Sequence, residues 1–108
     1  MAIWPYNRQH VKKREDYRQV ARIHRALANE ARLMIIECLK DREHTVSELT
    51  KLIGLDQSTV SKHLSILLTA GILDNRKQAN NVYYRLLIPC VMDMFSCTSN
   101  VLKKMQSM

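Results

Sequence analysis

The sequence predicts a mainly helical domain that carries one small β-hairpin. Glycine and proline occur only twice each in 108 residues, which argues against a turn-rich β fold. Apolar residues recur at helical spacing through most of the chain, and only residues 72–76 and 82–86 resemble strands. The polar stretch 77–81 between these strands is rich in turn formers. The length predicts one domain, small enough for a second subunit to add useful burial.

Four helices are expected before the hairpin. They span about 16–27, 30–40, 46–53 and 57–70. Asn29 and Asp56 are suited to cap the second and fourth of these helices. Thr45 and Glu48 have the spacing of a capping box at the third helix, and Gly54 is suited to end it.

A fifth helix is expected over 89–106, with Pro89 in its first turn, where a missing N–H costs little. The stretch 1–15 precedes the helical pattern and is basic. The sequence therefore predicts a basic N-terminal arm over 1–15 and a single folded domain over 16–108.

Charge and composition narrow the classes of partner and compartment. The net charge of +7 favours an anionic partner, either nucleic acid or a membrane surface. The chain has no run of 18 apolar residues and no signal-peptide pattern, so we expect a cytoplasmic protein that does not span a membrane. Its three cysteines, Cys38, Cys90 and Cys97, are then expected to be thiols.

The fourth helix divides into an apolar face and a polar face. The polar side chains near its start are Gln57, Ser58, Thr59, Ser61, Lys62 and Ser65. Short hydrogen-bonding groups with few acids let a helix approach base edges in the major groove. A polar face is often merely solvated, but here it follows a capped helix and a glycine turn and precedes a basic hairpin. This order predicts a winged helix-turn-helix that binds double-stranded DNA, with Arg76 and Lys77 of the hairpin meeting phosphate or the minor groove.

Several motifs in this order resemble the ArsR/SmtB repressors. They are Ala26-Leu-Ala-Asn-Glu-Ala-Arg-Leu33, Thr45-Val-Ser-Glu-Leu49, Ser58-Thr-Val-Ser-Lys-His-Leu-Ser-Ile-Leu67, Ala70-Gly-Ile-Leu73 and Arg76-Lys-Gln78 followed by Val82-Tyr-Tyr-Arg-Leu86. The resemblance covers about residues 20–88. It implies a homodimer formed through the first and last helices, an imperfect inverted-repeat operator, and repression that an effector relieves.

The resemblance also implies DNA contacts from Gln57, Ser58, Ser61, Lys62 and His63. His63 has a second interpretation as a structural hydrogen-bonding residue, because it precedes a core leucine. The role of the basic arm also stays open. It could reach along DNA, thicken the dimer interface through its aromatic residues, or be disordered.

Two effector sites known in similar proteins are expected to be absent. Arsenic-responsive members carry Cys-Val-Cys where this chain has Thr45-Val46-Ser47, and hydroxyls are not soft-metal ligands. Zinc-responsive members use Asp and His on the last helix, which here has Asp93 but no His. The four histidines of the chain show no ligand spacing, so we interpret them as surface or capping residues.

The cysteines are the remaining candidates for sensing. Cys90 and Cys97 share a helix face but lie about 10 Å apart along the axis, too far for one ion to bridge. If two last helices pack antiparallel, Cys90 of one subunit approaches Cys97 of the other, and Cys38 is an alternative partner. Two thiolates suit Cu(I), Hg(II) or oxidation to a disulfide or polysulfide, and As(III) needs a third sulfur. No cofactor is expected to be obligatory.

Other interpretations stay open beside this one. Cys90, Met94, Cys97 and Val101 can equally form an apolar interface stripe, in which cysteine is a small buried hydrophobe. The chain would then be an effector-blind repressor or architectural dimer, or a protein-interaction module without DNA binding. An enzyme is not expected, because the sequence has no phosphate loop, no zinc-protease motif and no nucleophile paired with a base.

Overall fold

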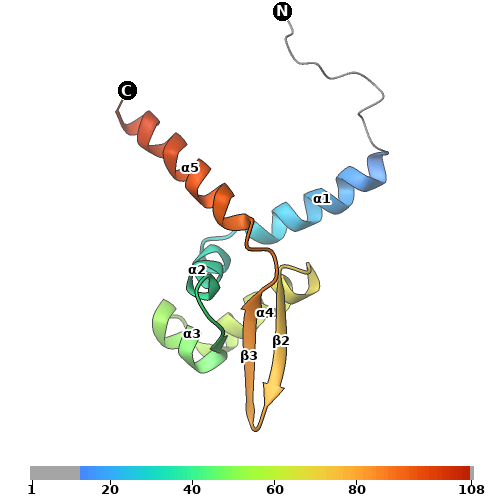
Figure 1. Cartoon of the computed structure of the whole chain (residues 1–108), viewed down its shortest axis with the longest axis vertical. Coiled ribbons are helices and arrows are strands. Elements are labelled where there is room, and N and C mark those ends of the chain that lie inside the picture. The colour runs from blue at the N-terminus through green and yellow to red at the C-terminus, as the bar shows by residue number, and fades with distance from the viewer. Residues whose placement is uncertain (1–12, 108) are drawn as a thin grey trace, which may run out of the picture.

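The computed structural model describes residues 13–107. The elements follow in the order α1 (Arg14–Leu27), α2 (Glu30–Leu39), β1 (His44–Thr45), α3 (Val46–Ile53), α4 (Gln57–Thr69), β2 (Leu73–Gln78), β3 (Asn81–Leu86) and α5 (Val91–Gln106). Helices α2, α3 and α4 form the body with the sheet, while α1 and α5 project from the body and diverge as a V (Figure 1). This is the mainly helical architecture with a small β wing that the sequence predicts.

The core lies between α2, α3, α4 and the base of the hairpin. Its fully buried side chains are Ile35, Ile36, Leu49, Val60, Leu64, Leu67, Ile72, Leu73 and Val91. Helix α2 supplies Ile35 and Ile36 to the centre of this core, as its nearly uniform apolar sequence predicts. The base of the hairpin and the start of α5 are thereby fixed to the two short helices α3 and α4.

The four signals predicted for the ends of α2, α3 and α4 are confirmed. The Asn29 side chain accepts a hydrogen bond from the Arg32 backbone N–H at 3.1 Å. Thr45 and Glu48 form both halves of a capping box. Gly54 follows α3 with φ of 84°, a conformation that is costly for residues with a Cβ, and Asp56 caps α4.

The sheet has a third strand that the sequence pattern does not predict. The strand order is β1-β3-β2, and His44 and Thr45 of β1 pair with Tyr84 and Tyr83 of β3. A strand of two residues is too short to show alternation, which explains the omission. The pairing buries His44 to 6% exposure, so the expectation of a surface or capping histidine is wrong at this position.

The hairpin is longer and its turn shorter than expected. Strand β2 continues to Gln78 and β3 begins at Asn81, so the loop is Ala79 and Asn80 alone. Polar residues pair here through their backbones, which no hydrophobic pattern reveals. As a result Lys77 lies within a strand, not in the turn.

Two helix boundaries also differ from expectation. Helix α1 begins at Arg14, two residues before the expected start, and α5 begins at Val91, two residues after it. Pro89 and Cys90 form a turn instead, in which the Val91 backbone N–H donates to the Ile88 carbonyl at 3.0 Å. Residues 1–12 of the arm predicted over 1–15 lie outside the described residues, and the division into arm and domain remains a prediction.

Candidate nucleic-acid interface

Helix α4 presents the polar face that the sequence predicts. Val60, Leu64 and Leu67 are buried in the core, which fixes the rotation of the helix about its axis. The residues left exposed on the opposite side include Gln57, Ser58, Ser61, Lys62 and Ser65. A rigid helix therefore displays short polar groups and one cation to the outside, as reading a major groove requires.

The N-terminal cap of α4 already uses two of the predicted DNA-contacting hydroxyls. Ser58 and Thr59 donate their hydroxyl protons to the Asp56 carboxylate at 2.5 and 2.7 Å, and the Thr59 backbone N–H donates at 3.1 Å. While this cap is in place, both hydroxyls can act toward a base only as acceptors. Thr59 is also half-buried, whereas Ser61 is exposed and makes no side-chain hydrogen bond among the described residues. Ser61 is thus free to donate and to accept.

The Asp56 cap predicts a dependence of stability on pH. Hydrogen bonds from Ser58, then from the Thr59 hydroxyl and backbone, hold the pKa of Asp56 well below its ordinary value. Since the folded-state pKa is depressed, this stabilisation is complete above the ordinary pKa of aspartate and is lost as the pH falls below it.

Urea unfolding of wild type and of an Asp56→Asn variant between pH 6 and pH 3 measures this contribution. Asparagine still caps the helix but does not titrate. We expect the stability difference between wild type and variant to shrink steadily below about pH 4. A difference that stays constant across this range would show that the cap does not depend on the charge of Asp56.

His63 points back into the fold, where Arg32 of α2 approaches it. The Arg32 Nη1 atom lies 3.3 Å from the His63 Nδ1 atom. Arg32 also donates to the backbone carbonyl oxygens of Ala26, at 2.6 Å, and Arg25, at 3.4 Å. One guanidinium therefore ties the end of α1 to the middle of α4. This geometry favours the structural interpretation of His63 over the DNA-contacting one.

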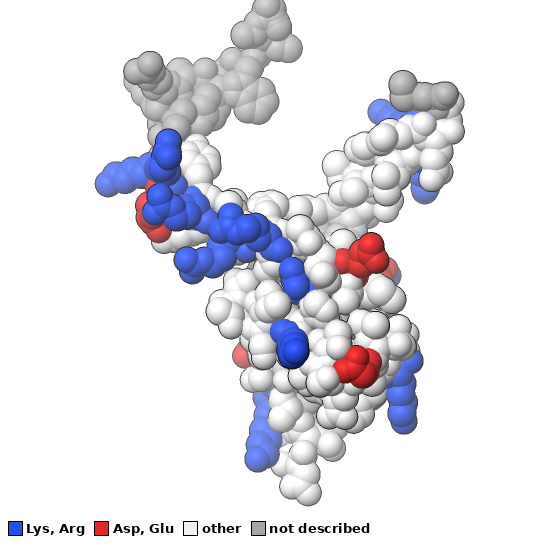
Figure 2. Space-filling view, turned by 180° about the vertical axis from the view of Figure 1, so that it is seen from behind, with Lys and Arg blue, Asp and Glu red and all other residues white. Residues whose placement is uncertain are grey.

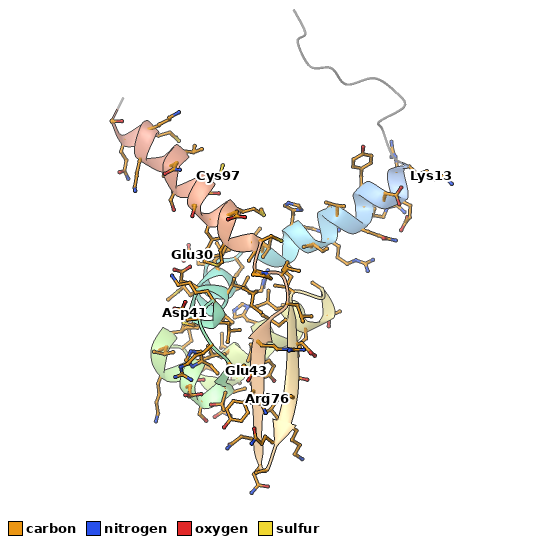
Figure 3. All side chains as sticks on the ribbon, in the orientation of Figure 1. Lys13, Glu30, Asp41, Glu43, Arg76 and Cys97 are labelled. Carbon is orange, nitrogen blue, oxygen red and sulfur yellow. The ribbon has the colours of Figure 1, made fainter. Side chains whose placement is uncertain are left out.

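The two wing cations differ in how they are engaged. Arg76, on the wing formed by β2 and β3, makes a bidentate ion pair with Glu43, with Nε–Oε2 and Nη2–Oε1 distances of 2.9 Å each. Its guanidinium also lies 4.9 Å from the centroid of the Tyr83 ring. Figure 3 shows Glu43 and Arg76 facing each other between the loop after α2 and the wing. The Arg76 guanidinium lowers the pKa of Glu43. Lys77 is exposed and has no carboxylate partner in the range 13–107, so it is the freer of the two to meet a phosphate.

The cysteines lie in different surroundings. Cys38 is half-buried against the core, and burial followed by the charge of Glu37 raises the pKa of its thiol. Cys90 and Cys97 are exposed, and Figure 3 places Cys97 midway along the projecting α5. Within residues 13–107 no cluster of three or more His, Cys, Asp or Glu side chains could hold a metal ion. One subunit therefore offers two separate thiols, Cys90 just before α5 and Cys97 within it, not an assembled site.

The projecting helices leave apolar side chains in solvent. Val20 of α1 is 51% exposed, and Val101 and Met105 of α5 are 51% and 64% exposed. The half of α5 nearest the body instead packs Met92 and Phe95 against the core. Exposed apolar faces on two diverging helices are typical of a surface that a second subunit covers.

Sequence reasoning missed three residues that shape this interface. Glu43 and Arg76 are 33 residues apart, and no local pattern links them. The guanidinium of Arg32 reaches α1 and α4 only because α2 lies between them. The buried position of His44 was missed because β1 has only two residues, too few to show a strand pattern.

The fold and the exposed face of α4 together define a winged helix-turn-helix DNA-binding protein. Residues 29–75 match the family described as bacterial regulatory protein, arsR family. The transcriptional activator HlyU of Vibrio cholerae is 44% identical over 62 residues, which are 57% of this chain and 57% of HlyU. The biofilm growth-associated repressor of Xylella fastidiosa is 34% identical over 79 residues, covering 73% of this chain and 68% of that protein.

A solved structure agrees with these matches. The homodimeric winged helix-turn-helix DNA-binding domain of Mb0332 from Mycobacterium bovis superposes with a TM-score of 0.74 at 28% identity, covering 90% of this chain and 92% of that one. The chain belongs to the ArsR family and is a DNA-binding transcriptional regulator, not an enzyme. None of the described helices is long and apolar enough to cross a membrane.

Proposed function

We propose that the chain is a cytoplasmic homodimeric repressor that reads an imperfect inverted repeat through α4. Its release from DNA follows the action of a thiol-reactive or thiophilic effector at Cys90 and Cys97. The observation that carries the DNA-binding part is the exposed polar face of α4, held in one orientation by three buried side chains on its other side. Base contacts come from Gln57, Ser61 and Lys62, and Ser58 and Thr59 act as acceptors while they remain bonded to Asp56.

The homodimer is supported by the exposed apolar faces of α1 and α5 and by the homodimeric relative from Mycobacterium bovis. A two-fold dimer presents two α4 helices to two half-sites, so its operator is an inverted repeat. The repressor named in Xylella fastidiosa supports repression, whereas HlyU is named an activator. Binding that covers a promoter represses it without any further activity of the protein.

Sequence-specific binding is tested by fluorescence anisotropy, which measures the affinity of the protein for two duplexes of equal length. One carries the inverted repeat upstream of the protein's own gene, and the other carries a scrambled sequence. We expect two subunits per duplex and an affinity for the repeat at least about 1,000-fold above that for the scrambled DNA. Equal affinity for the two duplexes at the same salt concentration would contradict sequence-specific binding.

The thiol switch is supported by the exposure of Cys90 and Cys97 and by their position just before α5 and within it, since α5 is one of the proposed dimer helices. An effector that joins two thiolates across the interface would change the relative orientation of the two α4 helices, because each α5 is rooted in its own core through Val91. The raised thiol pKa of Cys38 makes it a weaker candidate for the site.

A Cys90→Ser/Cys97→Ser variant is expected to bind the operator like wild type but to lose its response to the effector. The assay adds As(III), Cu(I), Hg(II), polysulfide or peroxide to the protein–DNA complex. A Cys38→Ser variant is the matched control and should keep the response. If no reagent releases wild type, the cysteines only pack and the protein is an effector-blind repressor. If the double variant is released as wild type is, the response does not pass through Cys90 and Cys97, and the proposed thiol switch is wrong.

A further inference from the structure

We propose that the basic face of α1 is a second DNA-contacting surface, which holds backbone phosphates beside the bases that α4 reads. This inference rests on the proposed function and deepens it. In the proposed function, α4 supplies the sequence specificity. A phosphate-binding surface would position the duplex and supply affinity that does not depend on sequence.

The first observation is an open groove of about 460 Å³ between α1 and the second half of α4. Its polar lining consists of Arg22, Arg25, Arg32, Ser65 and Thr69, and no carboxylate lines it. Guanidinium and hydroxyl groups are the usual side-chain donors to phosphate oxygens. Arg32 is engaged with backbone carbonyl oxygens, but neither Arg22 nor Arg25 has a carboxylate partner among the described residues.

The second observation is that the groove is one end of a longer basic band. Arg14, Arg18, Arg22 and Arg25 follow one another at intervals of four, four and three residues, so they share one face of α1. Figure 2 shows this band of Lys and Arg side chains extending along α1 to the body of the domain. Arg18 pairs with Glu15 at 2.7 Å, but this exposed pair is readily exchanged for a phosphate.

The length of the band indicates a polymeric anion. From Arg14 to Arg25 the helix rises about 16 Å, and one DNA strand carries a phosphate for about every 3.4 Å of duplex axis. The band is therefore longer than a single phosphate group and can face several phosphates of a duplex. A small phosphate compound would fill the groove alone and leave the rest of the band unused.

The position of the band fits both the duplex and the dimer. Ser65 and Thr69 lie one and two turns after Ser61, so the groove continues the exposed face of α4. Val20 lies two residues after Arg18 and two before Arg22, which places it about 200° around the helix from the basic face. The apolar face of α1 that a second subunit would cover therefore points away from the basic face. Dimer formation thus leaves the band open to DNA.

The test compares an Arg22→Gln/Arg25→Gln variant with a Lys103→Gln/Lys104→Gln control, which removes the same charge from the far end of α5. Binding to the operator and to scrambled DNA is measured by anisotropy at several salt concentrations. We expect the α1 variant to lose affinity for both duplexes by the same factor, about tenfold or more, with the operator preference unchanged. The plot of log affinity against log salt should become shallower by up to about 4 for the dimer. The control variant should follow wild type.

Three results would overturn the inference. If the α1 variant binds as wild type does, or if the control loses as much affinity, the band is a solvated surface. If the α1 variant binds both duplexes as wild type does but loses a binding of inorganic phosphate that calorimetry detects in wild type, the groove holds a small anion instead. If wild type binds no DNA at all, the proposed function fails together with this inference. In the other outcomes wild type still binds DNA, and only the inference about α1 fails.

Discussion

Replacing Gln57 and Ser61 with glutamate is expected to abolish operator binding without unfolding the protein. Each side chain is exposed on the face of α4 that the account assigns to base contacts. Losing a good base contact costs about 1–3 kcal/mol, so the two losses together cost about 2–6 kcal/mol, to which repulsion from phosphate adds. An acid near the start of a helix interacts favourably with the helix dipole, so the fold should be as stable as in wild type.

A matched variant separates this effect from a general change of charge. Ser96→Glu/Ser99→Glu adds the same two charges to exposed positions on α5. Anisotropy with the operator should show little change for this control, and urea unfolding should show both variants folded. Operator binding by the α4 variant within threefold of wild type would place the DNA-reading surface elsewhere.

A Val20→Glu/Val101→Glu variant is expected to be monomeric and to lose tight operator binding. Burying one valine side chain is worth about 1.5–3 kcal/mol, and a glutamate in its place would have to be desolvated. With two changes in each subunit, the dimer should weaken by well over about 100-fold. A monomer contacts a single half-site, so the affinity that comes from engaging both half-sites together is lost.

Sedimentation velocity measures the association state, and circular dichroism measures the helical content of the same samples. Leu87→Glu is the control, because Leu87 is an exposed apolar residue of the segment between β3 and α5. The control should remain dimeric and bind the operator. A wild-type protein that sediments as a monomer, or a dimeric Val20→Glu/Val101→Glu variant, would refute an interface through α1 and α5.

The parts of this fold that could be predicted are those whose signals are local. Three helices are capped by residues that lie within four positions of the groups they bond, so the sequence alone shows where these helices begin. The caps are Asn29, Asp56 and the Thr45–Glu48 pair. The apolar spacing of α4 likewise shows which side is buried and which is exposed. The polar face of the candidate site therefore follows from the sequence.

The rest depends on contacts between distant residues. The pairing of β1 with β3 and the Arg76–Glu43 ion pair join segments about 30 to 40 residues apart, and neither leaves a pattern in either segment. The same holds for the link between Arg32 and His63, which favours a structural role for His63 over a DNA contact. Even on α4, the sequence shows which hydroxyls are present but not that Asp56 occupies the protons of two of them.

The central claim is that α4 reads DNA sequence, and the most direct test is a base-by-base affinity profile. Wild type and a Ser61→Ala variant are measured on operator duplexes in which each base pair is changed in turn. We expect the Ser61→Ala variant to lose about 1–3 kcal/mol of binding free energy and to become indifferent to the base at one position in each half-site, with the other preferences intact. An unchanged profile, or an even loss at every position, would contradict base reading by α4.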